Sequence, residues 1–170
     1  MEKIIKGFIG ALGGLTSKVL GKRIIVFIIS LLPVLELRGG LLAASLLGLD
    51  PLSSYIIAVI GNIIPVPFIL WFMGRILKWM KTRKKLKKIS DCIDKKVEKN
   101  RGKIEKFGFL GLVLFIGIPL PGTGAWTGCV VASVLEMDKK KAFIAALIGV
   151  LMSSIIMMIL SFGLLRGITG

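Results

Sequence analysis

The sequence contains no histidine, only two cysteines and only nine acidic residues among 170. Without histidine, the chain cannot form the Ser–His or Cys–His pairs of nucleophilic enzymes, and it lacks a common metal ligand. Cys92 lies in a basic segment and Cys129 in an apolar one, so the two thiols have neither metal-ligand spacing nor the setting of a disulfide. We therefore expect no enzyme activity, no catalytic residues, no metal site and no cofactor.

Apolar residues are abundant. They make up 55% of the chain, glycine occupies 21 positions, and the mean hydropathy is +0.87. Soluble domains of this size do not carry such long apolar runs, which are typical of membrane-spanning helices. The composition predicts an all-α integral membrane protein with one membrane domain over residues 1–170. We expect it in the cytoplasmic (inner) membrane of a prokaryote.

Positive charge gathers in one segment, because fourteen of the 24 lysines and arginines lie between Arg75 and Lys106, beside four acidic residues. A basic segment between apolar spans is expected on the cytoplasmic side of the membrane. This placement explains the net charge of +15 without a nucleic-acid partner. We expect residues 78–106 to form a helical linker, which either contacts anionic lipid headgroups or only fixes the orientation of the chain.

The rest of the chain divides into three parts. Residues 1–23 carry apolar side chains at close to helical spacing, with lysines between them, which predicts an amphipathic helix at the membrane interface. Residues 24–77 and 107–168 are two mostly apolar regions on either side of the linker.

The first apolar run, Ile24–Leu49, is interrupted near its middle by Pro33 and by Gly39-Gly40, which weaken or break helices. Each of the two resulting arms suits about half of a bilayer roughly 30 Å thick, as in a re-entrant hairpin. Leu52–Leu77 then has the length of a full membrane span.

The two apolar regions align without a gap at an offset of 88 residues. The identical pairs include Pro33/Pro121, Gly40/Gly128, Asp50/Asp138 and Gly61/Gly149. Apolar composition alone would not place proline, aspartate and glycine in one register, so we predict an internal duplication. Repeats with paired interruptions are typical of transporters with a site near the membrane midplane.

Two topologies fit this repeat. If each broken segment crosses the membrane, the halves are parallel, with four crossings and both termini cytoplasmic. If each is a re-entrant hairpin, every half contains one hairpin and one crossing, and the halves are inverted. We favour the hairpins, because half-bilayer arms explain where the breaks lie.

Glu36 and Arg38 are the only charged residues of the run Ile24–Leu49. Each costs roughly 2.5–3.5 kcal/mol at mid-membrane, and such residues usually serve function. Positions i and i+2 of a helix do not face each other, so the two charges meet only where the backbone is irregular. Arginine suits phosphate or carboxylate, and a desolvated glutamate can exchange a proton near neutral pH. The alternative is a structural clamp to Asn62 or to open backbone groups.

The matching break in the second region is rich in glycine and offers backbone amides, two hydroxyls and an indole N–H. Glycine-rich turns before a helix can hold an anion, although glycine also permits close helix packing. The candidate substrate-binding or coupling residues are Glu36, Arg38, Asn62, Pro33, Gly39, Pro121, Gly122, Thr123, Gly124, Trp126 and Thr127.

The motif Pro33-x-x-Glu36-Leu37-Arg38-Gly39 and the segment from Pro119 to Gly128 resemble those of the putative small multidrug export protein family, which implies a membrane protein involved in export. The layout of two proline-broken hairpins with a midplane acid and base also looks like the DedA/SNARE-associated (VTT) superfamily. That second resemblance is architectural. It implies lipid movement, including polyprenyl phosphate carriers, and proton-linked transport.

Three hypotheses follow. The first is a transporter or lipid translocase, proton-coupled through Glu36, for a substrate whose anionic, phosphate-like headgroup binds Arg38. The second is an exporter of cationic drugs, with Glu36 as the cation site and Arg38 opposing it. The third is a non-transporting membrane scaffold. The expected partners are membrane lipids, a proton and a second copy of the chain in a homodimer.

Overall fold

The computed structural model describes residues 2–11, 18–83 and 108–164, together with the single positions 91, 95 and 98. Every regular element within these ranges is a helix, which confirms the predicted all-α class. Most of the predicted linker, residues 78–106, lies outside the described residues. The chain divides into two compact units, and each is described by itself: Met1–Ile64 with Val150–Gly170 is the first unit, and Pro65–Gly149 is the second.

Two stretches of helix are long and apolar enough to cross a membrane by length and composition. They are Pro51–Ile76, with 26 residues, and Lys139–Gly163, with 25. The first contains α4 (Pro51–Ile63) and most of α5 (Pro65–Thr82). The second contains α8 (Lys139–Met158) and most of η2, a π-helical segment. The first corresponds to the span predicted over Leu52–Leu77, and the second lies in the apolar region predicted over residues 107–168.

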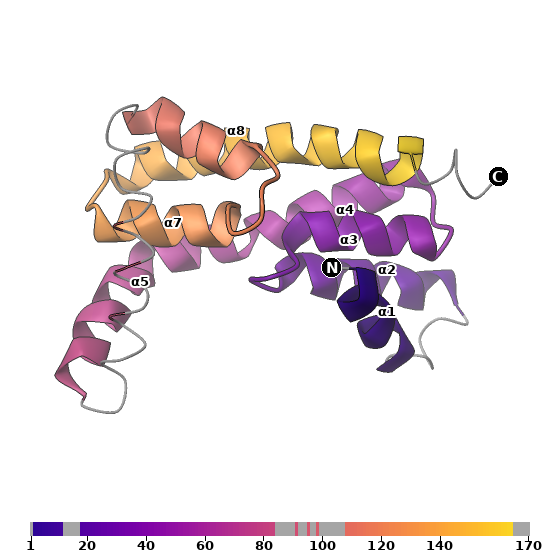
Figure 1. The fold of residues 1–170 in the computed structure, drawn as a ribbon, viewed down its shortest axis with the longest axis horizontal. Helices are drawn as coiled ribbons and strands as arrows, with labels where there is room; N and C mark the ends of the chain where they lie inside the picture. Colours follow the sequence, from indigo (N-terminus) through magenta and orange to yellow (C-terminus); the bar gives the residue numbers. More distant parts are fainter. Residues whose placement is uncertain are drawn as a thin grey trace. The chain divides into compact units, whose positions relative to one another are not determined.

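In the first unit, α2 (Val19–Leu31) and α3 (Glu36–Leu46) lie side by side as a helical hairpin, and α4 packs against both (Figure 1). The turn of this hairpin falls at residues 32–35, where Pro33 was expected to break the helix. η2 (Ile159–Leu164) also packs against α3.

The N-terminal helix α1 (Glu2–Ala11) packs on α3 and completes the core of the first unit. This cluster consists of buried apolar side chains from three helices and the turn: Ile5, Ile25, Ile29, Leu35 and Ala43. The helix predicted near the N-terminus is therefore present over residues 2–11, and its place at a membrane interface stays a prediction.

α2 begins at Val19, earlier than the apolar arm predicted from Ile24. The basic residues at its start bind the far end of the hairpin: the Lys22 ammonium donates to the Leu47 carbonyl oxygen at 3.0 Å, and Arg23 lies 3.5 Å from the Ser53 hydroxyl. Long basic side chains can lie along an apolar helix while their charge reaches polar groups at its end. The helix therefore tolerates two charges in its first turns.

The second unit repeats this plan. The helix Gly108–Gly117 and α7 (Ala125–Val134) are the two arms, α5 packs against α7, and the start of α8 follows. The Ser133 hydroxyl lies 3.4 Å from the Ile69 carbonyl oxygen, which links α7 to α5, and 2.8 Å from the Cys129 carbonyl oxygen within α7.

Aspartate caps both long helices. The Ser53 amide donates to the Asp50 carboxylate at 2.8 Å, and the Lys141 amide donates to the Asp138 carboxylate at 2.9 Å. The bond from the Ser53 amide is the main reason why the pKa of Asp50 is lowered. Pro51 occupies the first turn of α4, where its missing N–H costs nothing.

The hairpin arms also end alike. After α3, Gly48 has a φ of +64° and the Leu49 amide donates to the Ala44 carbonyl oxygen at 3.0 Å. After α7, Glu136 has a φ of +54° and the Met137 amide donates to the Ala132 carbonyl oxygen at 3.0 Å. This left-handed cap normally takes glycine, so the second unit holds a glutamate in a strained position.

Glycines allow the arms to approach closely. A methyl group added at Gly40 would clash with the Ser30 hydroxyl and lie 3.2 Å from the Ser30 Cβ. At Gly128 it would lie 2.8 Å from the Ile116 Cδ1. In each unit a residue larger than glycine would therefore push the second arm away from the first.

The same contacts show where the two units differ in length. A methyl group added at Gly61 would lie 3.0 Å from the Ser30 Cβ, and one added at Gly149 would lie 2.7 Å from the Ile116 Cβ. The paired glycines are 88 residues apart (149 − 61), whereas Ser30 and Ile116 are 86 apart (116 − 30). The gapless alignment is therefore wrong for the first arms, and the second hairpin has a turn two residues longer.

Candidate functional site

Glu36 and Arg38 lie in the interior of the first unit, with exposed fractions of 4% and 7%. Both belong to the first turn of α3, and the opposite charge of Glu36 acts electrostatically on Arg38. A carboxylate in the first turn is also favoured by the helix dipole. Burying two charged residues is expensive unless they are paired and hydrogen-bonded, so this placement needs a specific reason.

The backbone at Glu36 is irregular, as the two-residue spacing required. Its φ of +51° places a non-glycine residue in the left-handed region, at a cost of about 1 kcal/mol or more. The turn is closed by the Glu36 amide, which donates to the Leu32 carbonyl oxygen at 2.9 Å, and by the Gly39 amide, which donates to that of Leu35 at 2.8 Å. Strain of this kind is often found at functional sites.

Two other predicted residues, Pro33 and Gly39, lie close to this pair in the chain. Pro33 is exposed in the turn between α2 and α3. Gly39 is buried, and a methyl group there would lie 2.7 Å from the Leu35 Cβ and 3.1 Å from the Ile29 side chain. Gly39 therefore brings the start of α3 close to α2, and so helps to place Arg38.

All buried polar side chains that the structure describes belong to the first unit. They are Ser30, Glu36, Arg38, Ser54, Asn62, Ser153, Ser154 and Ser161, each at most 7% exposed. Within the described part of Pro65–Gly149, the buried side chains are apolar. The first unit therefore has a polar interior, and the second has an apolar one.

Several of these groups have hydrogen-bond partners. The Ser30 hydroxyl donates to the Val26 carbonyl oxygen at 2.8 Å. The Ser154 and Tyr55 hydroxyls are 2.9 Å apart, which joins α8 to α4. Such bonds satisfy the groups internally and stabilise the packing of the helices.

Asn62 has no such partner. It is fully buried, and neither its amide nitrogen nor its carbonyl oxygen forms a hydrogen bond within the described residues. The hydroxyls of Ser54, Ser153 and Ser161 are likewise buried and without a partner there. Each buried unsatisfied group costs about 1–3 kcal/mol, so a native chain that retains several of them has a use for them or holds water there.

A π-helical segment lies beside this polar interior. η2 contains the buried Ser161, whose carbonyl oxygen accepts a bond from the Ser45 hydroxyl of α3 at 2.8 Å. π-helical turns inside longer helices are frequent at functional sites. The sequence pattern did not indicate η2, and it gave little signal for Ser54 or Ser161 beyond a serine in an apolar run.

The glycine-rich loop of the second unit is ordered by Thr123. Its hydroxyl lies 2.9 Å from the Ile118 carbonyl oxygen and 2.8 Å from that of Leu120. Gly122 and Gly124 have φ angles of +83° and +133°, which glycine adopts without strain. The Thr123 hydroxyl therefore stabilises the loop itself.

The other predicted residues of this loop differ in exposure. Pro121 and Gly122 are exposed, Gly124 is buried, and Trp126 and Thr127 at the start of α7 are half-buried. These residues belong to the second unit, whereas Glu36, Arg38 and Asn62 belong to the first. The meeting of the two groups across one site stays a prediction.

The comparison with protein families gives one match. The model described as "Putative small multi-drug export protein" matches residues 36–156, which is most of the chain. The chain belongs to this family. No curated protein and no solved structure matches it.

Membership of the small multi-drug export family is consistent with a membrane transporter. The matched region begins at Glu36 and includes Arg38, Asn62 and the loop from Pro121 to Thr127, while α1 and α2 lie outside it. The candidate residues from Glu36 onward are thus in the part that the family shares. The architectural likeness to the DedA superfamily stays a prediction.

Proposed function

We propose that this protein is a membrane transporter in which α4–α5 and α8 cross the bilayer and the two hairpins enter it as inverted, re-entrant repeats. Large apolar side chains on these helices are exposed, including Leu52, Ile56, Trp71, Ile148 and Ile155. Soluble monomers rarely expose such extended apolar surface, and lipid is the solvent that suits it.

The buried Glu36 and Arg38 carry the proposal. Helix packing alone needs neither charge, because the second unit closes its hairpin with apolar contacts instead. In the membrane interior each charged side chain is costly, and such residues usually mark a substrate or ion pathway. We assign Arg38 as the ligand of an anionic, phosphate-like headgroup, which its planar guanidinium can bind with two hydrogen bonds.

Asn62, which lies in the same unit as Arg38, would add to this site, and the loop Pro121–Thr127 of the second unit offers a further set of candidate ligands. Asn62 offers a buried amide whose donors and acceptor are available within the described residues. The loop offers backbone amides before α7, and Trp126 offers an indole donor.

Glu36 is assigned as the coupling carboxylate. A neutral carboxylic acid is far cheaper to hold in an apolar interior than a carboxylate, so proton uptake by Glu36 can accompany movement of the site between the two faces. The anion on Arg38 and the proton on Glu36 would then move together. A homodimer, lipid substrates and polyprenyl phosphates belong to the same proposal.

A second candidate is export of a cationic drug, which the family description and the buried carboxylate of Glu36 favour. Arg38 argues against it, because a cation two residues away from Glu36 would repel the substrate. The two candidates therefore predict opposite effects for removal of the Arg38 charge.

Translocation measured in vesicles reconstituted with the protein distinguishes these functions. NBD-labelled phosphatidic acid, read by dithionite bleaching, serves as the anionic probe and ethidium as the cationic probe, each with and without a pH gradient. We expect translocation of the anionic probe only, accelerated by the gradient. Arg38→Gln and Glu36→Gln should each slow it about 10- to 100-fold, as loss of one charged hydrogen bond predicts.

Matched controls are available on the surface. Arg75 and Glu136 are exposed, and Glu136 shares the positive φ of Glu36, so Arg75→Gln and Glu136→Gln should leave translocation unchanged. Ethidium transport that depends on Glu36 and increases in Arg38→Gln would establish the cationic exporter instead. Movement of neither probe would favour a scaffold.

A further inference from the structure

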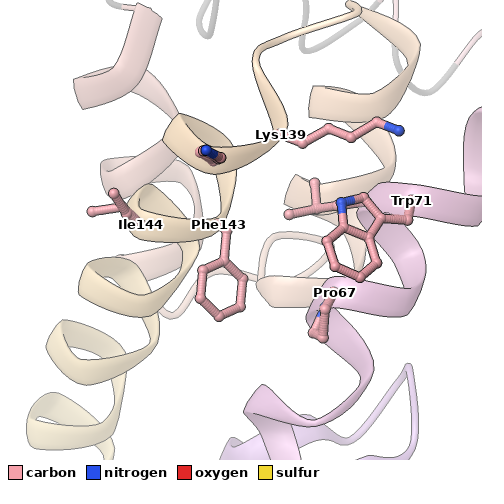
Figure 2. Close-up of a pocket in the computed structure, with 7 residues that line it drawn as sticks. Pro67, Trp71, Lys139, Phe143 and Ile144 are labelled. Carbon is pink, nitrogen blue, oxygen red and sulfur yellow. The ribbon is translucent and has the colours of Figure 1, made fainter.

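A groove of about 290 Å³ lies within the second unit, between α5 and the first turns of α8 (Figure 2). Its lining is apolar except at one end, where two lysines stand: Pro67, Leu70, Trp71, Phe143, Ile144, Lys139 and Lys140. All seven residues belong to Pro65–Gly149. The transport site proposed above uses none of them.

The groove has an aromatic floor and a cationic end. Trp71 and Pro67 of α5 face the Phe143 ring of α8, and the Lys139 side chain extends past Trp71 (Figure 2). Trp71 is 58% exposed, so its ring offers contact area to a ligand. Asp138 precedes the two lysines in the chain, and its carboxylate accepts a hydrogen bond from the Lys141 amide of α8.

We propose that this groove binds one anionic phospholipid of the surrounding membrane, with an acyl chain against Trp71 and Phe143 and the phosphate between Lys139 and Lys140. Charge complementarity selects this occupant, because the charged groups among the described lining residues are two cations, Lys139 and Lys140. The groove lies near the lower end of the volumes of small-ligand pockets, which suits part of one lipid molecule.

The position of the two lysines at the start of α8 also favours an anionic phospholipid. Lys139 and Lys140 open the apolar span Lys139–Gly163, so their ammonium groups lie at the level of lipid headgroups when this helix crosses a bilayer. Tryptophan is common at that depth, because its ring is apolar and its N–H polar. This inference shares the membrane placement with the proposed function and is independent of Glu36 and Arg38.

Quenching of the Trp71 fluorescence by brominated lipids tests the groove. The protein is placed in nanodiscs that contain brominated phosphatidylglycerol or brominated phosphatidylcholine, and Trp71→Phe identifies the share of the fluorescence due to Trp71. We expect phosphatidylglycerol to bind about tenfold more tightly than phosphatidylcholine, because the two lysines attract its net negative charge. Lys139→Gln/Lys140→Gln should abolish this preference, and Lys139→Arg/Lys140→Arg should keep it.

Lys141→Gln is the matched control, because Lys141 is adjacent and exposed but does not line the groove. An equal loss in this variant, or an unchanged preference in Lys139→Gln/Lys140→Gln, would overturn the site. Displacement of the lipid by millimolar glycerol 3-phosphate would show a site for soluble phosphates instead. Absence of quenching by either lipid would overturn the membrane placement, whereas lost transport alone would leave this inference intact.

Discussion

The two units share one backbone plan but differ in what they bury. Each contains a hairpin held by glycine contacts, an aspartate-capped long helix and a left-handed cap after the second arm. The described part of the first unit buries eight polar or charged side chains, and that of the second buries apolar ones. An apolar interior is therefore compatible with this arrangement of helices, and the first unit buries polar groups that the described part of the second unit does not.

Corresponding positions make the difference specific. The glycine contacts give an offset of 86 residues for the first arms and 88 for the later helices. Ser30 then corresponds to the buried Ile116, and Ser54 to the buried Ala142. By the same alignment, Arg38 corresponds to Trp126. Because the second unit closes a similar hairpin with apolar side chains, we expect a ligand, and not packing, to be the reason for the polar side chains of the first unit.

Among the changes that remove no buried charge, the largest effect is expected from the glycine contacts. Gly40→Ala should destabilise the protein by about 2–3 kcal/mol, because the new methyl group meets the Ser30 hydroxyl and the Val26 backbone oxygen. Gly128→Ala should cost about 1–2 kcal/mol, because the new methyl group meets only side-chain atoms, the Cγ1 and Cδ1 of Ile116, which a rotation of that side chain can partly relieve. Denaturation in detergent measures both, and equal losses would mean that the two hairpins are equally rigid.

A second test replaces a buried polar side chain of the first unit with an apolar one, as is found in the second unit. Asn62→Val should stabilise the protein by about 1–2 kcal/mol, because it removes buried groups that lack partners. The same variant should slow translocation of the anionic probe. A gain of stability with full transport would show that Asn62 does not belong to the site, and a loss of stability would show that its amide is satisfied in the folded protein.

The left-handed caps allow a smaller test. Glu136→Gly should raise the free energy of unfolding by about 1 kcal/mol, because glycine adopts a φ of +54° without strain. Gly48→Ala in the first unit should lower it by a similar amount. The thermal midpoints of the two variants should therefore move in opposite directions, and a shift in the same direction would contradict the assigned caps.

The smallest effect concerns pH. The folded pKa of Asp50 is lowered, chiefly by the Ser53 amide, so its contribution to stability is present above the unfolded pKa and is lost as the pH falls through the folded pKa. Asp50→Asn keeps the cap but removes the titration, so its stability should depend less on pH below about 4 than that of the wild type. Identical acid profiles would contradict this role.

Much of this plan could be predicted from the sequence. Asp50-Pro51 and Asp138 mark where long helices begin, because these residues have strong local preferences. Pro33 marks the hairpin turn for the same reason. The paired charges Glu36 and Arg38 were identified because no other charge occurs in their apolar run.

Other features depend on contacts that local sequence does not encode. The gapless alignment paired Pro33 with Pro121, whereas the packing of Ser30 and Ile116 pairs the first arms two residues earlier. The positive φ of Glu36 has no signal, because glutamate does not favour it and tertiary packing imposes it. The apolar groove required knowledge of which faces of α5 and α8 remain open.

The central claim is tested most directly by the double variant Glu36→Gln/Arg38→Gln, compared with each single variant in both stability and translocation of NBD-labelled phosphatidic acid. Removing one charge leaves the other uncompensated and costs about 3–5 kcal/mol, whereas removing both restores a neutral interior. We predict that the double variant regains near-wild-type stability while translocation of the anionic probe stays slowed by about 10- to 100-fold or more. Wild-type translocation by the stable double variant would contradict the claim and reduce the two charges to a structural clamp.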